Sequence, residues 1–187
     1  MGSSAVISAS TAPRRLSPLL QRVLIVDPED GAVGALVDLL RTISNCQVWT
    51  APFDAGVDLA AKIAATLVFV EQSAGQDGAA FVSALRRVPS PARQTAVIMT
   101  TSRPTVFATI AARECGAHEV LRKPFVSADL VRRLESVALE PREWIETMTY
   151  VGPDRRRFNS GDYGAAAKRE GDGGERGASV VQRASAG

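Results

Sequence analysis

The stretch TLVFVEQS, residues 66–73, holds four consecutive large apolar residues followed directly by an acid. A short apolar run with β-branched and aromatic members predicts a buried strand, which covers residues 67–70. The run ends at Glu71, and Gln72 and Ser73 follow. The acid therefore either marks the point where a strand reaches water or belongs to a site.

Similar apolar runs occur on both sides of this stretch, at residues 23–26, 47–50, 96–99 and 118–121. Segments with apolar residues at helical spacing follow each run, at residues 31–43, 53–65, 78–88, 105–115 and 127–139. Alternation of strand and helix with short connections requires parallel strands and right-handed crossovers. Strands this apolar must be covered on both faces. The sequence therefore predicts an α/β fold with a doubly wound, five-stranded parallel sheet.

The composition argues against several classes of protein. A net charge of +2 indicates no strong field for nucleic acid or a membrane surface. No apolar run approaches the ~20 residues of a membrane-spanning helix, and the N-terminal segment does not have the order of a secretory signal. Cys46 and Cys115 lack a metal-ligand spacing, so we interpret them as buried free thiols. We expect a cytoplasmic protein.

The two ends of the chain differ from its centre. Residues 1–20 are rich in Ser, Ala and Pro without periodicity, which predicts a disordered tail. Residues 21–140 form the predicted domain. Residues 141–187 are predicted to be a mostly disordered extension, because their final part has too few large apolar residues. Such a segment does not offset an ordering entropy of about 1–2 kcal/mol per residue.

Polar side chains stand where four of the predicted strands end. Asp27 follows the first strand, Glu71 the third, Thr101 the fourth and Lys123 the fifth. In doubly wound sheets, the functional crevice lies beyond the carboxyl ends of the strands. The sequence therefore predicts that an acid pair, a hydroxyl and an ammonium meet at one edge of the sheet.

This set of residues, with the segment GAHEVLRKPF at 116–125, resembles the CheY-like receiver domain of two-component response regulators. The resemblance covers about residues 22–139 and implies the strand order 2-1-3-4-5. It implies that residue 71 stands at the position of the aspartate that accepts a phosphoryl group from a histidine kinase. Asp27 then corresponds to one of two acids that hold Mg²⁺, while Thr101 and Lys123 correspond to the residues that bind the phosphoryl oxygens.

The sequence departs from the receiver pattern at three positions. Glu71 replaces the phosphoacceptor aspartate, and its extra methylene moves the carboxylate by about 1.5 Å. Pro28 replaces the second metal-binding acid, which weakens Mg²⁺ binding unless Glu29 or Asp30 compensates. Val120 replaces the usual switch aromatic. We expect slow phosphorylation or none.

Two interpretations of Glu71 remain open. Its longer reach places a permanent negative charge near Lys123 and Thr101, which partly imitates a phosphoaspartate. Alternatively, the domain is fixed in one state and serves as a docking surface, which Val120 favours because no ring is present to report on the site.

The extension contains the motif GPDRRRF at residues 152–158. Arginine clusters bind phosphates, so Arg155, Arg156 and Arg157 are candidate anion-binding residues. Some CheY-like proteins resemble this chain in carrying arginine-rich C-terminal extensions that bind cyclic di-GMP, so an alternative prediction is a cyclic dinucleotide effector. DNA binding is not predicted. Apolar residues before the motif either pack on the domain or contact a partner: Trp144, Ile145, Met148, Tyr150 and Val151.

The preferred prediction is a stand-alone, response-regulator-like signalling protein that acts by protein–protein contact without phosphorylation. Its partner is a histidine kinase or another signalling protein. The predicted contact surface includes Phe107, Ile110 and His118. An enzyme is not predicted, because no nucleophile–base pair and no Gly-rich phosphate loop is visible.

Overall fold

The computed structural model describes residues 12–72 and 78–157. Its centre is a parallel sheet of five strands in the order β2-β1-β3-β4-β5, which confirms the predicted fold and strand order. The strands are β1 (Arg22–Val26), β2 (Gln47–Thr50), β3 (Leu67–Glu71), β4 (Ala96–Thr101) and β5 (Glu119–Arg122).

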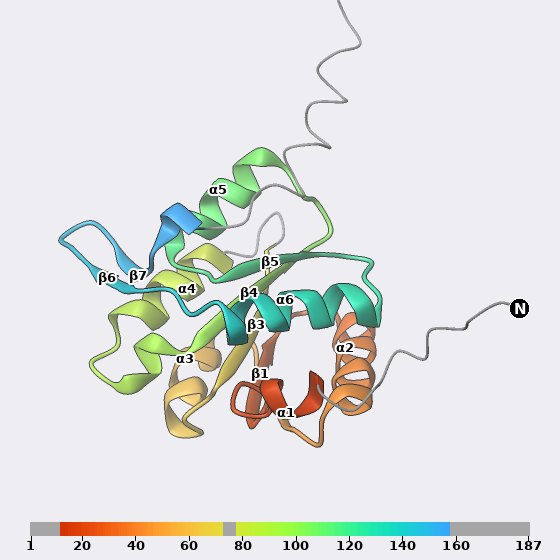
Figure 1. Cartoon of the computed structure of the whole chain (residues 1–187). Helices are drawn as coiled ribbons and strands as arrows, with labels where there is room; N and C mark the ends of the chain where they lie inside the picture. Colours follow the sequence, from red (N-terminus) through yellow and green to blue (C-terminus); the bar gives the residue numbers. More distant parts are fainter. Residues whose placement is uncertain (1–11, 73–77, 158–187) are drawn as a thin grey trace, which may run out of the picture.

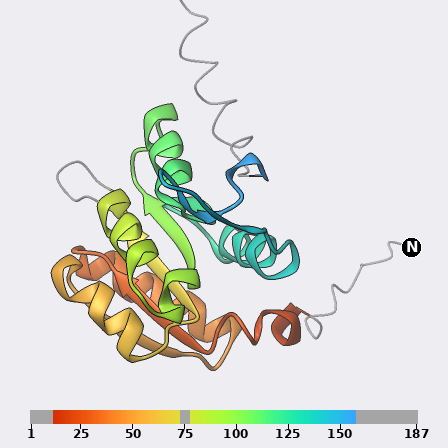
Figure 2. The same cartoon turned by 90° about the vertical axis from the view of Figure 1, so that its left-hand side faces the viewer.

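Helices cover both faces of this sheet (Figures 1 and 2). One face packs against α3 (Phe53–Lys62), α4 (Gly78–Arg87) and α5 (Val106–Cys115). The other face packs against α1 (Ala12–Leu16), α2 (Asp30–Ile43) and α6 (Ser127–Leu139). A short 3₁₀ helix, η1 (Pro91–Gln94), precedes β4. Within residues 12–72 and 78–157, no helix has the length and apolarity needed to cross a membrane.

The alternation of side chains along the strands explains why two separate layers of core form. Every residue of β3 is buried, and successive side chains of a strand point to opposite faces of the sheet. Val68 and Val70 therefore belong to the layer beneath α3, α4 and α5, whereas Leu67 and Phe69 belong to the layer beneath α2 and α6. Glu71, at the end of the same strand, is held at the rim of the core.

The prediction of a disordered tail through residue 20 is wrong for residues 12–20. These residues form α1 and a turn, and α1 contacts α6. Leu16 and Leu20 are buried in the same layer of core as Leu36 and Leu134. Burial of two large leucines, each worth about 1.5–3 kcal/mol, outweighs the weak helical propensity of this Pro- and Ser-containing segment. Residues 1–11 lie outside the described residues.

The prediction of disorder after residue 140 is wrong for residues 141–157. Strands β6 (Trp144–Glu146) and β7 (Val151–Pro153) form an antiparallel hairpin, followed by the 3₁₀ helix η2 (Arg155–Arg157). The hairpin lies beside α4 (Figure 1), and Tyr150 between its strands is buried. Tyr150 thus packs on the domain, in line with one of the two interpretations above, whereas Met148 is exposed. Residues 158–187 lie outside the described residues.

Candidate functional site at the carboxyl ends of the strands

The ammonium of Lys123 joins two acids that come from different strands. Its Nζ lies 2.6 Å from Oδ2 of Asp27, directly after β1, and 2.7 Å from Oε2 of Glu71, at the end of β3. Lys123 itself follows β5, and the peptide bond to Pro124 is cis. The structure therefore brings together three of the four residues that the sequence predicted to meet.

All three side chains are largely removed from water. Their exposed fractions are 12% for Lys123, 6% for Asp27 and 5% for Glu71. Burial lowers the pKa of Lys123, but hydrogen bonds to Asp27 and Glu71 outweigh this effect and leave the pKa above its ordinary value. The lysine therefore stays charged at neutral pH and serves as the buried counter-ion of both carboxylates.

The hydroxyl that contacts Glu71 belongs to Thr100 rather than Thr101. Thr100 Oγ1 donates to Oε2 of Glu71 at 2.7 Å, whereas Thr101 Oγ1 donates to the carbonyl of Gln72 at 3.0 Å. The register of the sheet is the reason, because Glu71 lies directly opposite Thr100. Residues paired in register point to the same face, and the next residue points to the other. The sequence shows two adjacent threonines but does not show the register that chooses between them.

The site offers fewer carboxylate ligands for Mg²⁺ than the receiver resemblance implies, because Pro28 stands in place of the second acid. Both oxygens of Asp27 are already engaged: Oδ1 accepts from the backbone N–H of Glu29 at 2.9 Å, and Oδ2 accepts from Lys123. Glu29 does not compensate for Pro28, because its side chain is 71% exposed and its nearer oxygen lies 3.9 Å from the lysine. No group of three or more metal-ligating side chains occurs in the described part of the chain. A cation already bridges the two acids, and it is the lysine ammonium.

The predicted contact surface is only partly continuous. Phe107 is 84% exposed, and Val106 and Ile110 are also exposed on α5, near the carboxyl end of β4. His118 lies at the opposite end of the sheet, where its Nδ1 accepts from the backbone N–H of Val97 at 3.1 Å. The prediction that His118 shares a surface with Phe107 and Ile110 is therefore wrong, because these residues lie near opposite ends of the sheet.

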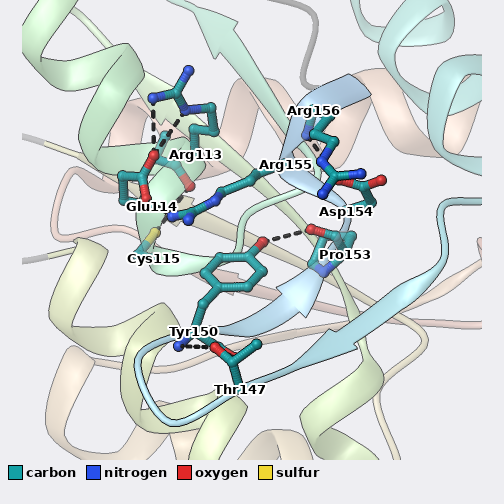
Figure 3. A network of polar contacts seen from close by, with 10 residues as sticks. Arg113, Glu114, Cys115, Thr147, Tyr150, Pro153, Asp154, Arg155 and Arg156 are labelled. Carbon is teal, nitrogen blue, oxygen red and sulfur yellow. Dashed lines mark hydrogen bonds and ion pairs between the residues drawn. The ribbon is translucent and has the colours of Figure 1, made fainter.

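The arginine motif is engaged with the domain (Figure 3). Arg155 forms an ion pair with Glu114 of α5, and its guanidinium carbon lies 5.0 Å from the centre of the Tyr150 ring. The backbone N–H of Arg156 donates to Asp154, and Arg157 ends η2. Arg155 thus anchors the extension to α5, a contact that the sequence pattern does not indicate.

Comparisons of sequence with family models and with curated proteins find no match. Solved structures do match. The chemotaxis protein CheY4 of Vibrio cholerae is 23% identical, with 63% of this chain and 98% of that chain covered and a TM-score of 0.57. A candidate response regulator from Chloroflexus aurantiacus is 26% identical, with 64% and 98% covered and a TM-score of 0.58. A receiver domain protein from Clostridium thermocellum is 22% identical, with 65% and 96% covered and a TM-score of 0.56.

These neighbours share the class of fold that the strand order and the strand-end residues define. The chain has the CheY-like fold of response regulator receiver domains, as its sequence resemblance indicated. Within that fold, this chain carries Glu71 at the end of β3 and Pro28 after Asp27.

Proposed function

We propose that this chain is a response-regulator-like signalling protein whose receiver domain works without phosphorylation. The observation that carries the proposal is the closed cluster of Asp27, Lys123 and Glu71, in which the lysine bridges the two acids. The lysine that the receiver resemblance assigns to the phosphoryl oxygens is instead held by Asp27 and Glu71. The acid that stands in for the phosphoacceptor is already paired.

Three features of Glu71 oppose phosphoryl transfer to it. Its carboxylate is buried, its Oε2 is shared by Lys123 and Thr100, and its extra methylene shifts the oxygen that would attack phosphorus. In-line transfer depends on placement, and a displacement of about 1 Å costs roughly a hundredfold in rate. Without a suitable set of Mg²⁺ ligands, the developing charge on the phosphoryl group is also left without its usual counter-ion.

Of the two interpretations of Glu71, the geometry favours a domain fixed in one state. A mimic of phosphoaspartate would engage the hydroxyl of Thr101, but that hydroxyl donates to the carbonyl of Gln72 instead. Val120 is a buried aliphatic residue and offers no ring that could change position. We therefore assign to Glu71 a structural role, which is to hold Lys123 and Thr100 in a permanent arrangement.

The domain then acts by contact with a protein partner, a histidine kinase or another signalling protein, in the cytoplasm. Support comes from the exposed apolar residues of α5, namely Val106, Phe107 and Ile110. Large apolar side chains grouped on one exposed helix are typical of protein interaction surfaces. Catalysis by this chain is not part of the proposal.

Intact-mass spectrometry after incubation with acetyl phosphate and Mg²⁺ tests the proposal. The wild-type chain is expected to show no adduct, while an aspartate-bearing receiver domain in the same mixture serves as the positive control. The Glu71→Asp variant restores the acceptor but not the metal ligand replaced by Pro28, so it is expected to react weakly at most. A stoichiometric phosphoryl adduct on Glu71 of the wild type would refute the proposal.

A pull-down from lysate of the native cell tests the contact surface. Phe107→Ser is expected to lose the captured partner, while Met148→Ser, a matched change of an exposed apolar residue on the hairpin, keeps it. Glu71→Ala is expected to weaken capture only as far as it destabilises the domain. Equal capture by both serine variants would rule out α5 as the contact surface.

The alternative function, a cyclic dinucleotide effector, has less support because Arg155 is already paired with Glu114. Calorimetry with cyclic di-GMP decides this point. Binding that disappears when Arg155, Arg156 and Arg157 are all replaced by alanine would favour the alternative function.

A further inference from the structure

A cavity lies at the end of the sheet opposite to Glu71. It has a volume of about 510 Å³ and opens where β3 and β4 begin, beside Thr66, Ala96 and His118. Small-molecule sites in proteins commonly have volumes of about 300–1,000 Å³. The cavity is therefore large enough for a small organic ligand, and it is separate from the proposed signalling site.

Two segments that lie outside the strand–helix alternation contribute to its wall. Arg15 comes from α1, and Arg142 comes from the start of the C-terminal extension. Both segments were predicted to be disordered, yet both pack against the domain at this place. Residues at the starts of β3 and β4 and residues of α6 also line it.

The wall of the cavity is electropositive. Arg15 and Arg142 line it, and none of the described residues that line it is acidic. Behind the wall, Glu119 is fully buried and bonds both Arg133, at 3.2 Å, and Arg142, at 2.8 Å. The bond to Glu119 holds Arg142 in place.

His118 adds a neutral hydrogen-bond donor. Burial lowers the pKa of His118 well below its ordinary value, and the positive charges of Arg86 and Arg142 lower it further, so the ring is neutral. Its Nδ1 accepts from Val97, so the hydrogen of the neutral ring is on Nε2. Polar Gln94 and apolar Leu19 and Ala138 also line the cavity. The lining thus combines cations and donors with apolar surface.

We infer that this cavity binds a small organic anion, one with a phosphate or carboxylate head and an apolar body. Arg15 and Arg142 attract the head, His118 donates to it, and the apolar lining accepts the body. The inference does not depend on the proposed function, because no residue of the Asp27, Glu71 and Lys123 cluster lines this cavity.

Calorimetric titration of the full chain with phenyl phosphate, at low salt, tests the inference. Saturable binding with a Kd of about 1 mM or tighter is expected. Inorganic phosphate, which lacks the apolar body, and benzyl alcohol, which lacks the charge, are each expected to bind at least about fivefold more weakly.

Two variants locate the site without disturbing the core. Arg15→Gln removes an exposed cation, and Gln94→Glu places a nearly isosteric negative charge on the exposed wall; each is expected to weaken phenyl phosphate binding about fivefold or more. Arg103→Gln removes an equally exposed charge at the other end of β4, and is expected to leave binding unchanged. No saturable binding by the wild type, or equal loss in all three variants, would overturn the inference.

Discussion

Lys123 Nζ lies 2.7 Å from Glu71 Oε2, although their strands, β5 and β3, are separated in the sheet by β4. The lysine also reaches Asp27 after β1, so one side chain connects three strand ends. Residues from such distant parts of the chain meet only after the sheet is assembled. The stability of this arrangement can be measured by changing one charge at a time.

Removing the charge of Lys123 is predicted to lower the free energy of unfolding more than removing the charge of Glu71. Lys123→Met leaves Asp27 and Glu71 buried without their counter-ion, so the free energy of unfolding is expected to fall by about 3 kcal/mol or more. Glu71→Gln leaves the ion pair with Asp27 intact and is expected to cost about 1–2 kcal/mol. Urea denaturation of both variants provides the comparison. A larger loss in Glu71→Gln than in Lys123→Met would contradict the assignment of Lys123 as the shared counter-ion.

Stability is predicted to fall as the pH drops below 6.5, because of His118. Its pKa in the folded state lies well below its ordinary value of 6.5, so the unfolded chain takes up the proton first. The contribution of His118 is therefore fully present above pH 6.5 and is lost below it, with a slope of up to about 1.4 kcal/mol per pH unit. Chemical denaturation at pH values between roughly 7.5 and 5.5 measures this slope.

His118 is the only histidine of the chain, so the assignment can be checked with a single variant. His118→Asn keeps an acceptor for the N–H of Val97 but does not titrate in this range. Its stability is expected to be nearly constant between about pH 7 and pH 5.5. The same slope in variant and wild type would show that another group is responsible.

Two glycine-to-alanine substitutions are predicted to have opposite effects on the stability of the domain. A Cβ on Gly78, at the start of α4, would lie 2.4 Å from the carbonyl oxygen of Glu71, and this oxygen is backbone. Gly78→Ala is therefore expected to destabilise the domain by about 1–3 kcal/mol. In α2, nothing lies within 4 Å of a Cβ on Gly34. Gly34→Ala is expected to stabilise by about 0.5–1 kcal/mol, through helix propensity alone. Thermal unfolding of the pair tests whether α4 begins in close contact with the end of β3.

Replacement of Arg86 is predicted to lower the free energy of unfolding more than most single substitutions in the chain. Its buried guanidinium donates to the carbonyl oxygens of Gly116 (2.8 and 3.0 Å), Arg93 (2.8 Å) and Thr95 (2.9 Å). Burial lowers its pKa to about 10, so it remains charged at neutral pH. Arg86→Met would leave several buried carbonyls without a donor, and we expect the free energy of unfolding to fall by about 3–5 kcal/mol.

The neighbouring arginine provides a matched control for this prediction. Arg87 is exposed on the same turn of α4, and Arg87→Met is expected to change stability by less than about 0.5 kcal/mol. Urea denaturation again measures both. The hairpin depends on Arg86 as well, because the Trp144 ring lies 5.4 Å from its guanidinium carbon. Comparable losses in Arg86→Met and Arg87→Met would show that the buried carbonyl contacts do not matter.

The alternation of apolar runs and helical patterns was sufficient to predict the sheet. Short runs such as LVFV at residues 67–70 are buried on both faces, and the apolar residues of the run are by themselves enough to predict this burial. Asp27 and Glu71 were recognised because an acid that directly follows such a run stands out. Which of the two adjacent threonines contacts Glu71 could not be predicted, because strand register is not a local property.

The ends of the domain were predicted poorly for a related reason. Leu16 and Leu20 stand in a segment without periodicity, so nothing local shows that the domain buries them. Trp144 likewise packs against Arg86, which is far away in the sequence, and the guanidinium of Arg86 donates to backbone carbonyls outside its own helix. Sequence patterns indicate which residues are neighbours within one helix or strand. They do not indicate which residues of other helices or strands a side chain will contact.

The sequence by itself determined the alternation of five strands and five helices in the central domain and placed two acids and a lysine at strand ends, because hydrophobic periodicity and strand termini are properties of short segments. Only the tertiary structure decided that Lys123 bridges both acids, that Thr100 rather than Thr101 contacts Glu71, and that residues of both chain extensions line an electropositive cavity. These relationships depend on register and packing between segments that are distant along the chain, and such distances are set only when the whole domain has folded.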